Sequence, residues 1–264
     1  MAQLANTPSL PLHPTPPRPV AVIDIGATSI RMAIAEIHAD GEVRTLDTLV
    51  QPVDLGREAF DVRRLSRASI EKAAGILKKY QRVLQEYGIS SPQDLRVVAT
   101  TAVREALNRL AFTDRVYIVT GLNVEPIDEA EVNRITYMGI TPQLRSHPDL
   151  ADGRSVVVEV GGGNTELLVI RSGNVLHSQS YRLGSLRLLQ LLDQANVSAA
   201  RRRILLESHI RRILDMIVEE VHSDAMIHLV AFGGDMRFAA HQLLDDWDGT
   251  SLAQLSTDRL IEFT

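Results

Sequence analysis

Two acidic residues stand near the ends of apolar, β-branched runs, and a glycine follows each of them closely. Asp24 lies in the segment 19–35, and Glu159 lies in the similar segment 155–170. A carboxylate among apolar neighbours is costly to bury unless a cation or several hydrogen-bond donors meet it. Because Mg²⁺ takes carboxylate oxygens as ligands, two such acids facing one cleft predict a Mg²⁺ site. The alternative is that each acid only accepts hydrogen bonds from the amides of its own turn.

Glycine-rich turns follow both acids. Glycine permits a sharp reversal and leaves no Cβ in the way of a ligand, so the backbone amides of such a turn can converge on phosphate oxygens. A single glycine-rich turn serves geometry more often than ligand binding, and the prediction therefore depends on the duplication. The residues expected to contact phosphate are Gly26, Thr28 and Ser29 in the first turn, and Gly162, Gly163, Asn164 and Thr165 in the second.

Arg104 and Glu131 are two further candidates for chemistry. Arg104 follows two threonines that end a predicted strand and open a helix, which places its guanidinium close to free backbone amides. A capped helix with a solvated arginine explains the same pattern. Glu131 lies in the first turn of a predicted helix, where the helix dipole favours acids. A carboxylate beside a phosphate cleft is also a suitable general base for a water nucleophile, so both interpretations of Glu131 stay open.

The two similar segments organise the rest of the chain. Each predicts a strand, a tight turn and an antiparallel strand, and further strands are expected at 43–50 and 174–181. The chain therefore predicts two sheet-containing lobes, at 19–145 and 146–264, joined by a loop over 142–153.

Helical spacing and further apolar runs fill the remainder of the two lobes. Strands that alternate with helices favour an α/β fold with mixed sheets. The expected helices cover 62–87, 129–140, 185–193 and 198–221, and the expected strands cover 95–99 and 227–232.

Residues 1–18 form a proline-rich segment that we expect to be disordered. This segment has neither the basic start nor the apolar core of a signal peptide, and no apolar run in the chain approaches the length of a membrane span. The chain also contains no cysteine, which fits a reducing compartment. We therefore expect a cytoplasmic location and no membrane partner.

The composition limits the kind of ligand. The formal net charge is −5 and aromatic residues make up only 4% of the chain, so neither a general attraction to polyanions nor a base-stacking platform is expected. The composition therefore predicts no nucleic-acid partner. A phosphate-rich ligand would have to be held locally, by arginines, backbone amides or a metal ion.

Six segments, taken in order and spacing, resemble the exopolyphosphatase / guanosine-pentaphosphate phosphatase (Ppx/GppA) family of the actin-like superfamily. The resemblance implies two ribonuclease-H-like lobes with the active site in the cleft between them. It also implies Mg²⁺-dependent release of terminal phosphate from inorganic polyphosphate, guanosine pentaphosphate or both, and a homodimer as a common assembly. The segments are AVIDIGATSIRMAIAE (21–36), ATTAVREALN (99–108), IDEAEVNRITYMGI (127–140), VVVEVGGGNTELLVI (156–170), YRLGSLRL (181–188) and AFGGDMR (231–237).

The resemblance also implies roles for individual residues. Asp24 and Glu159 match the two acids associated with metal or phosphate, Arg104 matches an arginine that contacts the phosphate chain, and Glu131 matches the general base. The chain departs from the family pattern at Ala27, which replaces a hydroxyl residue, and at Glu159, which replaces aspartate. Only one of the paired glutamates of the base motif remains.

Two other functions stay open. One is a non-catalytic sensor that binds polyphosphate or a guanosine alarmone, which the altered base motif favours. The other is an actin-like ATPase or kinase, because the superfamily includes such enzymes. The chain stops at Thr264, where a helix begins, so we expect the second lobe to be truncated relative to the family.

Overall fold

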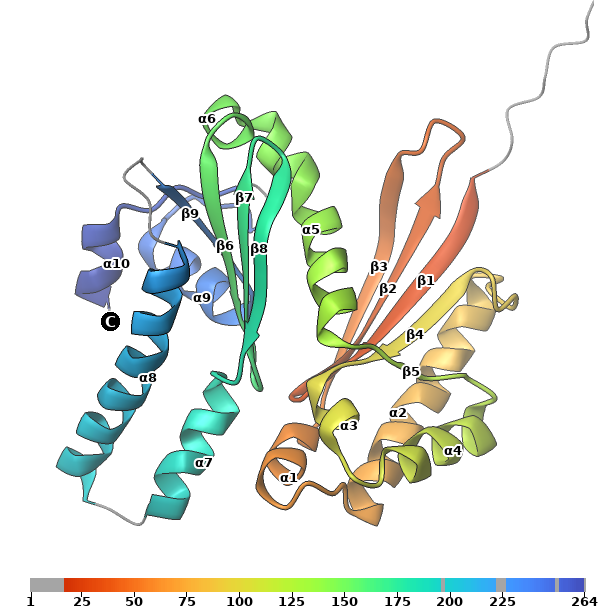
Figure 1. The fold of residues 1–264 in the computed structure, drawn as a ribbon. Helices are drawn as coiled ribbons and strands as arrows, with labels where there is room; N and C mark the ends of the chain where they lie inside the picture. The colour runs from red at the N-terminus through yellow and green to blue at the C-terminus, as the bar shows by residue number, and fades with distance from the viewer. Residues whose placement is uncertain (1–16, 196–197, 222–226, 250–251, 264) are drawn as a thin grey trace, which may run out of the picture.

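The computed structural model describes residues 17–195, 198–221, 227–249 and 252–263, which form two sheets with helices packed around them (Figure 1). The first sheet has five strands in the order β3-β2-β1-β4-β5, in which β1 pairs antiparallel with β2 and parallel with β4. The strands are β1 (Arg18–Ile25), β2 (Ser29–Ile37), β3 (Val43–Pro52), β4 (Leu95–Ala99) and β5 (Glu125–Pro126).

Helices cover the first sheet and complete its core. The longest of them begins after Ser66, whose hydroxyl accepts a hydrogen bond from the Ser69 amide and caps the helix. Its apolar side is buried, and the Tyr80 hydroxyl at that side donates to the Ile30 carbonyl at 2.9 Å. These helices are α1 (Leu55–Asp61), α2 (Arg67–Glu86), α3 (Thr101–Glu105) and α4 (Arg109–Thr120).

The second sheet has four described strands in the order β8-β7-β6-β9. Residues 165–170 of β7 are all buried, because apolar clusters lie on both faces of that strand. The strands are β6 (Arg154–Val160), β7 (Thr165–Arg171), β8 (Asn174–Tyr181) and β9 (Ile227–Phe232). The helices are α5 (Glu129–Ser146), α6 (Pro148–Ala151), α7 (Ser185–Ala195), α8 (Ala199–Val221), α9 (Gly234–Leu243) and α10 (Thr257–Phe263).

The two-lobed α/β architecture and both hairpins are confirmed, whereas the loop predicted at 142–153 is wrong. Helix α5 continues to Ser146 with Pro142 inside it, and α6 follows almost directly. Tertiary packing holds this helix past the proline, since Leu144 is buried against the second sheet and the Tyr137 hydroxyl donates to the Gly173 carbonyl.

Helix α5 therefore packs with the second sheet, although the predicted division at 145/146 places it in the first lobe. We use "first lobe" for β1–β5 with α1–α4, and "second lobe" for α5–α10 with β6–β9. Residues 1–16 of the proline-rich segment lie outside the described residues, and Arg18 already belongs to β1.

The two lobes meet through α1 and α7, which lie side by side (Figure 1). The Gln190 side chain donates to the Arg57 carbonyl, and the Gln194 side chain donates to Asp61 at 3.0 Å. None of the helices in the described ranges has the length and apolarity that crossing a bilayer requires.

Candidate functional site

The two glycine-cornered turns have the same geometry. The Gly26 amide donates to the Ser29 carbonyl at 2.9 Å, and the Gly161 amide donates to the Asn164 carbonyl at 2.9 Å. The amides between these closing bonds donate to no acceptor among the described residues. They belong to Ala27 and Thr28 in the first turn, and to Gly162, Gly163 and Asn164 in the second. Each turn thus leaves a short run of backbone amides for a ligand.

The two turns lie against each other where the lobes meet. The Ala27 carbonyl accepts from the Gly56 amide at the start of α1, and the Gly162 carbonyl accepts from the Leu186 amide at the start of α7, each at 2.9 Å. A methyl group placed on Gly162 would lie 3.5 Å from the Cβ of Ala27. The duplicated hairpins therefore direct their turns at one shared region.

Asp24 and Glu159 are brought together behind these turns. Burial raises the pKa of Asp24, and the charge of Arg31 on the neighbouring strand lowers it in part. Asp24 Oδ1 is buried and has no hydrogen-bond partner among the residues that the structure describes. Burial also raises the pKa of Glu159, and the charge of Asp24 raises it further. The two acids from different lobes are therefore close enough to repel each other.

Glu166 is a third acid at this place, and the sequence analysis did not identify it. It is directly opposite Glu159 in the pairing of β6 with β7, so both side chains lie on the same face of the sheet. Glu166 is 8% exposed, and its Oε1 accepts a hydrogen bond from the Ser180 hydroxyl at 2.9 Å. Its Oε2 is buried and has no hydrogen-bond partner in the described structure.

Burial raises the pKa of Glu166 to about 7, against the opposing effect of the Ser180 hydrogen bond. The nearby charge of Glu129 raises this pKa as well, and the charge of Arg104 lowers it. A carboxyl group with these surroundings changes its protonation near neutral pH, which suits proton transfer to and from water.

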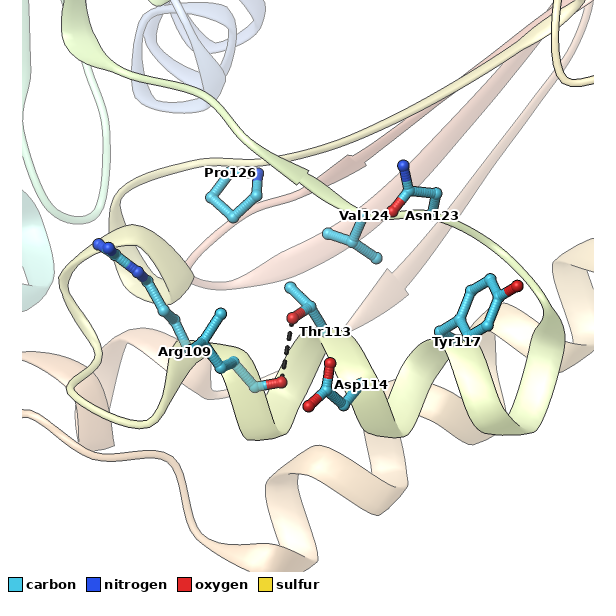
Figure 2. Close-up of a pocket in the computed structure, with 8 residues that line it drawn as sticks. Arg109, Thr113, Asp114, Tyr117, Asn123, Val124 and Pro126 are labelled. Carbon is cyan, nitrogen blue, oxygen red and sulfur yellow. Dashed lines mark hydrogen bonds between the residues drawn. The ribbon is translucent and has the colours of Figure 1, made fainter.

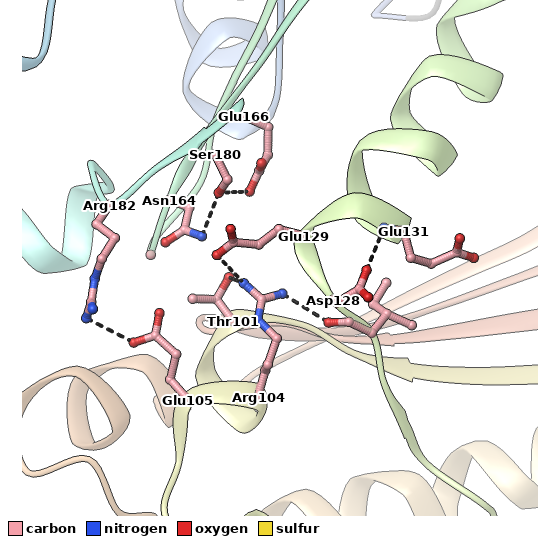
Figure 3. Close-up of polar contacts among 12 residues, drawn as sticks. Thr101, Arg104, Glu105, Asp128, Glu129, Glu131, Asn164, Glu166, Ser180 and Arg182 are labelled. Atoms are coloured by element: carbon pink, nitrogen blue, oxygen red, sulfur yellow. Dashed lines mark hydrogen bonds and ion pairs between the residues drawn. The ribbon is translucent and has the colours of Figure 1, made fainter. Parts of the chain in front are cut away.

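Arg104 reaches the same place from the first lobe. Its guanidinium donates to the Ile127 carbonyl at 3.0 Å and to Glu129 at 3.2 Å, and its side chain is 16% exposed. Figure 3 shows Arg104 below Asn164 and Glu166 of the second lobe, with Glu129 between them. The structure therefore brings together Asp24, Glu159, Arg104 and both turns.

The polar side chains of the turns mostly bind their own lobe. The Asn164 amide group donates to the Ser180 hydroxyl at 3.0 Å, and the Thr165 hydroxyl donates to the Leu183 carbonyl. Ser29 accepts a hydrogen bond from Arg31 at 3.2 Å, whereas Thr28 is exposed. Their contact with phosphate stays a prediction, and the backbone amides are the donors that the fold leaves unused.

Glu131 is not brought to this group. Its carboxylate accepts from Arg134 at 2.6 Å and from Arg96 at 3.1 Å, and these bonds lower its pKa to about 2, with Arg134 the larger cause. Figure 3 shows the side chain directed away from Arg104 and Glu166. A carboxylate with so low a pKa is a weak base, so the role predicted for Glu131 stays a prediction that this geometry does not favour.

A signal for Glu166 was present in the duplication. Glu166 occupies the position in the second hairpin that Arg31 occupies in the first, and each is the cross-strand partner of the hairpin's acid. Comparison of the two hairpins therefore identifies this pair of charged positions. Only the register shows that Glu166 shares a face with Glu159.

A separate groove of about 420 Å³ lies on the first lobe between α4 and the segment before α5 (Figure 2). Arg109, Asp114, Tyr117 and Pro126 are among the residues that line it, and none of the predicted site residues does so. The hydroxyl of Thr113 in this groove donates to the Leu110 carbonyl at 3.0 Å. The groove is therefore distinct from the interlobe site.

The model of the Ppx/GppA phosphatase family matches residues 33–244. The chain belongs to this family. Its matched region includes Arg104, Glu159 and Glu166, and Asp24 lies just before it. The resemblance recognised from the sequence is therefore confirmed.

Curated relatives and solved structures agree with this assignment. An Aliivibrio fischeri protein named guanosine-5'-triphosphate,3'-diphosphate pyrophosphatase is 26% identical over 186 residues, which are 68% of this chain and 36% of that protein. The chain thus spans about a third of the length of that relative. An Aquifex aeolicus member of the Ppx/GppA family is 25% identical with a TM-score of 0.73, over 94% of this chain and 78% of that one.

A Cytophaga hutchinsonii exopolyphosphatase is 22% identical with a TM-score of 0.75, over 86% of this chain and 70% of that one. At this identity the likeness shows the fold alone. Together with the Aquifex aeolicus structure, it supports the two-lobed fold implied by the family resemblance.

Proposed function

We propose that this member of the Ppx/GppA family is a phosphohydrolase that releases the terminal phosphate of inorganic polyphosphate or guanosine pentaphosphate. The observation that carries the proposal is Glu166, a buried carboxyl group whose pKa is raised to about 7 and whose Oε2 atom has no hydrogen-bond partner in the described ranges. It lies beside Arg104 and next to the free amides of the second turn. The name of one relative, guanosine-5'-triphosphate,3'-diphosphate pyrophosphatase, supports guanosine pentaphosphate as a substrate. Polyphosphate is the other substrate that the family resemblance implies.

The reaction needs positioning and charge neutralisation more than covalent chemistry. The amides of the two turns would hold the oxygens of the terminal phosphate, and Arg104 would neutralise part of its charge. Glu166 would accept a proton from water on Oε2 as the water oxygen bonds to phosphorus. The bridging P–O bond breaks, and the shortened chain leaves with that oxygen. This assigns the role of general base to Glu166 in place of Glu131.

Asp24 and Glu159 fit a Mg²⁺ ion. They come from different lobes, and the pKa of Glu159 is raised by burial and further by the charge of Asp24. Asp24 Oδ1 has no hydrogen-bond partner among the described residues. No group of three or more acidic, histidine or cysteine side chains suited to a metal occurs among the described residues. Two carboxylates are enough, because Mg²⁺ keeps several waters and shares substrate phosphates. When bound, the ion would neutralise charge on the phosphate oxygens.

The test is phosphate release by the full chain with Mg²⁺, using polyphosphate, guanosine pentaphosphate and ATP in parallel. We expect release from one or both of the first two, with ATP hydrolysed more slowly. Faster release from ATP would instead place the chain among actin-like ATPases and contradict the proposal.

One observation favours a second candidate, a sensor that binds the same ligands without turnover. Glu131, the residue that aligns with the family's base motif, is held by two arginines. Binding of polyphosphate or guanosine pentaphosphate without any phosphate release would identify the sensor.

A further inference from the structure

Arg187 of α7 connects the second phosphate-binding turn to the first lobe through one guanidinium group. Its Nε donates to the Gly163 carbonyl at 2.6 Å, and its Nη2 donates to Glu105 of α3. Its guanidinium carbon lies 4.2 Å from the centre of the Phe60 ring of α1. The side chain is only 13% exposed, so these three contacts occupy most of its surface.

The turn that Arg187 holds is packed tightly against the first lobe. A methyl group at Gly163 would lie 2.6 Å from Phe60 Cζ and 3.0 Å from Thr101 Cγ2. Thr101 begins α3, and Glu105 ends it directly after Arg104. A shift of the turn relative to α3 would therefore change the distance between the free amides of the turn and the Arg104 guanidinium.

The chemistry of arginine suits this task. The planar guanidinium can donate in two directions in its plane while its face stacks on an aromatic ring. A lysine ammonium could pair with Glu105, but it could not also reach the Gly163 carbonyl and cover Phe60 in one fixed geometry.

We propose that Arg187 is a positioning residue, which holds the second turn and Arg104 at their working separation across the lobe interface. It does so without contact to the phosphate itself. This inference rests on the proposed phosphohydrolase function, and it adds a residue that sets the geometry of the site from outside it.

Arg182 provides a matched control. It donates to the same Glu105 carboxylate at 3.2 Å, but its side chain is 70% exposed. In the described part of the chain, the hydrogen bond to the turn and the stacking on Phe60 belong to Arg187. Arg182→Gln and Arg187→Gln therefore remove the same charge next to the same acid. Only the second removes the connection to the turn.

The experiment compares kcat and KM for tripolyphosphate hydrolysis by the full chain and its variants. We expect Arg187→Gln to lower kcat by roughly tenfold to a hundredfold, because small misplacements of catalytic groups have effects of that size. Arg182→Gln should stay within about twofold of the wild type, as expected for an exposed ion pair. Arg187→Lys should not restore kcat.

Glu105→Ala keeps the proposal testable if Arg187→Gln does not fold. It should also lower kcat, and the double variant Arg187→Gln/Glu105→Ala should be no worse than Arg187→Gln alone, because the two side chains act together. Equal losses in Arg182→Gln and Arg187→Gln, full activity in Arg187→Lys, or additive losses in the double variant would each overturn the inference.

A binding measurement, which does not depend on hydrolysis, separates this inference from the proposed function. If the wild type releases no phosphate, the proposed function fails, and calorimetric titration with tripolyphosphate still tests Arg187. Weaker binding in Arg187→Gln than in Arg182→Gln supports the positioning role, and equal binding in both variants refutes it.

Discussion

Glu159 and Glu166 face each other across β6 and β7, so that two carboxyl groups of one hairpin lie on the same side of the second sheet. The charge of Glu159 raises the pKa of Glu166, in addition to the larger effect of burial. Asp24 of the first lobe in turn raises the pKa of Glu159. The three acids thus form a connected group, in which one acid is suited to proton transfer and two are suited to a cation.

The replacement Glu166→Gln should abolish most of the phosphate release. It keeps the size of the side chain and its contact with Ser180, but it removes the group that accepts the proton. We expect kcat to fall by about 10²–10⁴-fold, the usual contribution of a general base. Glu131→Gln is the matched control, because its carboxylate pairs with Arg96 and Arg134 away from the site. A larger loss in Glu131→Gln than in Glu166→Gln would return the role of base to Glu131.

The rate should depend on pH through Glu166. Only the deprotonated carboxylate can accept a proton, so kcat should rise with pH as Glu166 ionises and then level off. Burial raises the pKa of Glu166, whereas a Mg²⁺ ion at Glu159 would lower it. The Ser180 hydrogen bond lowers the pKa. Ser180→Ala should therefore move the rising limb to higher pH, as a pH–rate profile will show. An unshifted limb would mean that another group controls the rate.

The same carboxyl group should reduce the stability of the fold at high pH. Its pKa rises from an ordinary 4.5 to about 7 on folding, so the folded state holds more protons than the unfolded state between these values. The free energy of unfolding then falls as pH rises through this window, by at most about 3 kcal/mol. Glu166→Gln should therefore raise the thermal midpoint relative to the wild type at pH 8 and much less at pH 4.5. Equal effects at both pH values would contradict the raised pKa.

The hairpins were predictable because their signals are local: β-branched runs, an acid and a glycine turn repeat in the same order. Strand β9 was predicted as the structure has it, at 227–232. The course of α5 past Pro142 was not predictable, because tertiary contacts of Leu144 and Tyr137 override the local preference of proline.

The partners of the site residues were also beyond sequence reasoning. Glu131 and Glu129 both lie in the first turn of α5, and only the direction of each side chain decides that one meets Arg96 and the other Arg104. Likewise, the place of Glu166 beside Glu159 depends on strand register, which single positions in a sequence do not specify.

Mg²⁺ binding should depend on the charge of Asp24. Asp24→Asn keeps the shape of the side chain but removes a charge that a divalent ion needs. With Mg²⁺ and inorganic phosphate present, the thermal midpoint of the wild type should rise, because a ligand that binds only the folded state stabilises it. The midpoint of Asp24→Asn should rise less. The control is Asp40→Asn, which changes an exposed residue in the turn between β2 and β3. A response in Asp24→Asn equal to that of Asp40→Asn would argue against this metal site.

The close packing of the second turn makes Gly163 intolerant of a side chain. In Gly163→Ala the new methyl group would lie 2.6 Å from Phe60 Cζ, so the turn or the ring must move. Overpacking of this kind typically costs about 1–3 kcal/mol, and here it also separates the turn from α3. We expect lower unfolding free energy in urea and lower kcat. The control is Gly75→Ala in α2, where a methyl group would have no described atom within 4 Å and alanine should stabilise the helix by about 0.5–1 kcal/mol. If Gly163→Ala were as stable and active as Gly75→Ala, the turn would not be confined by Phe60, and the contact that Arg187 is proposed to maintain would lose its physical basis.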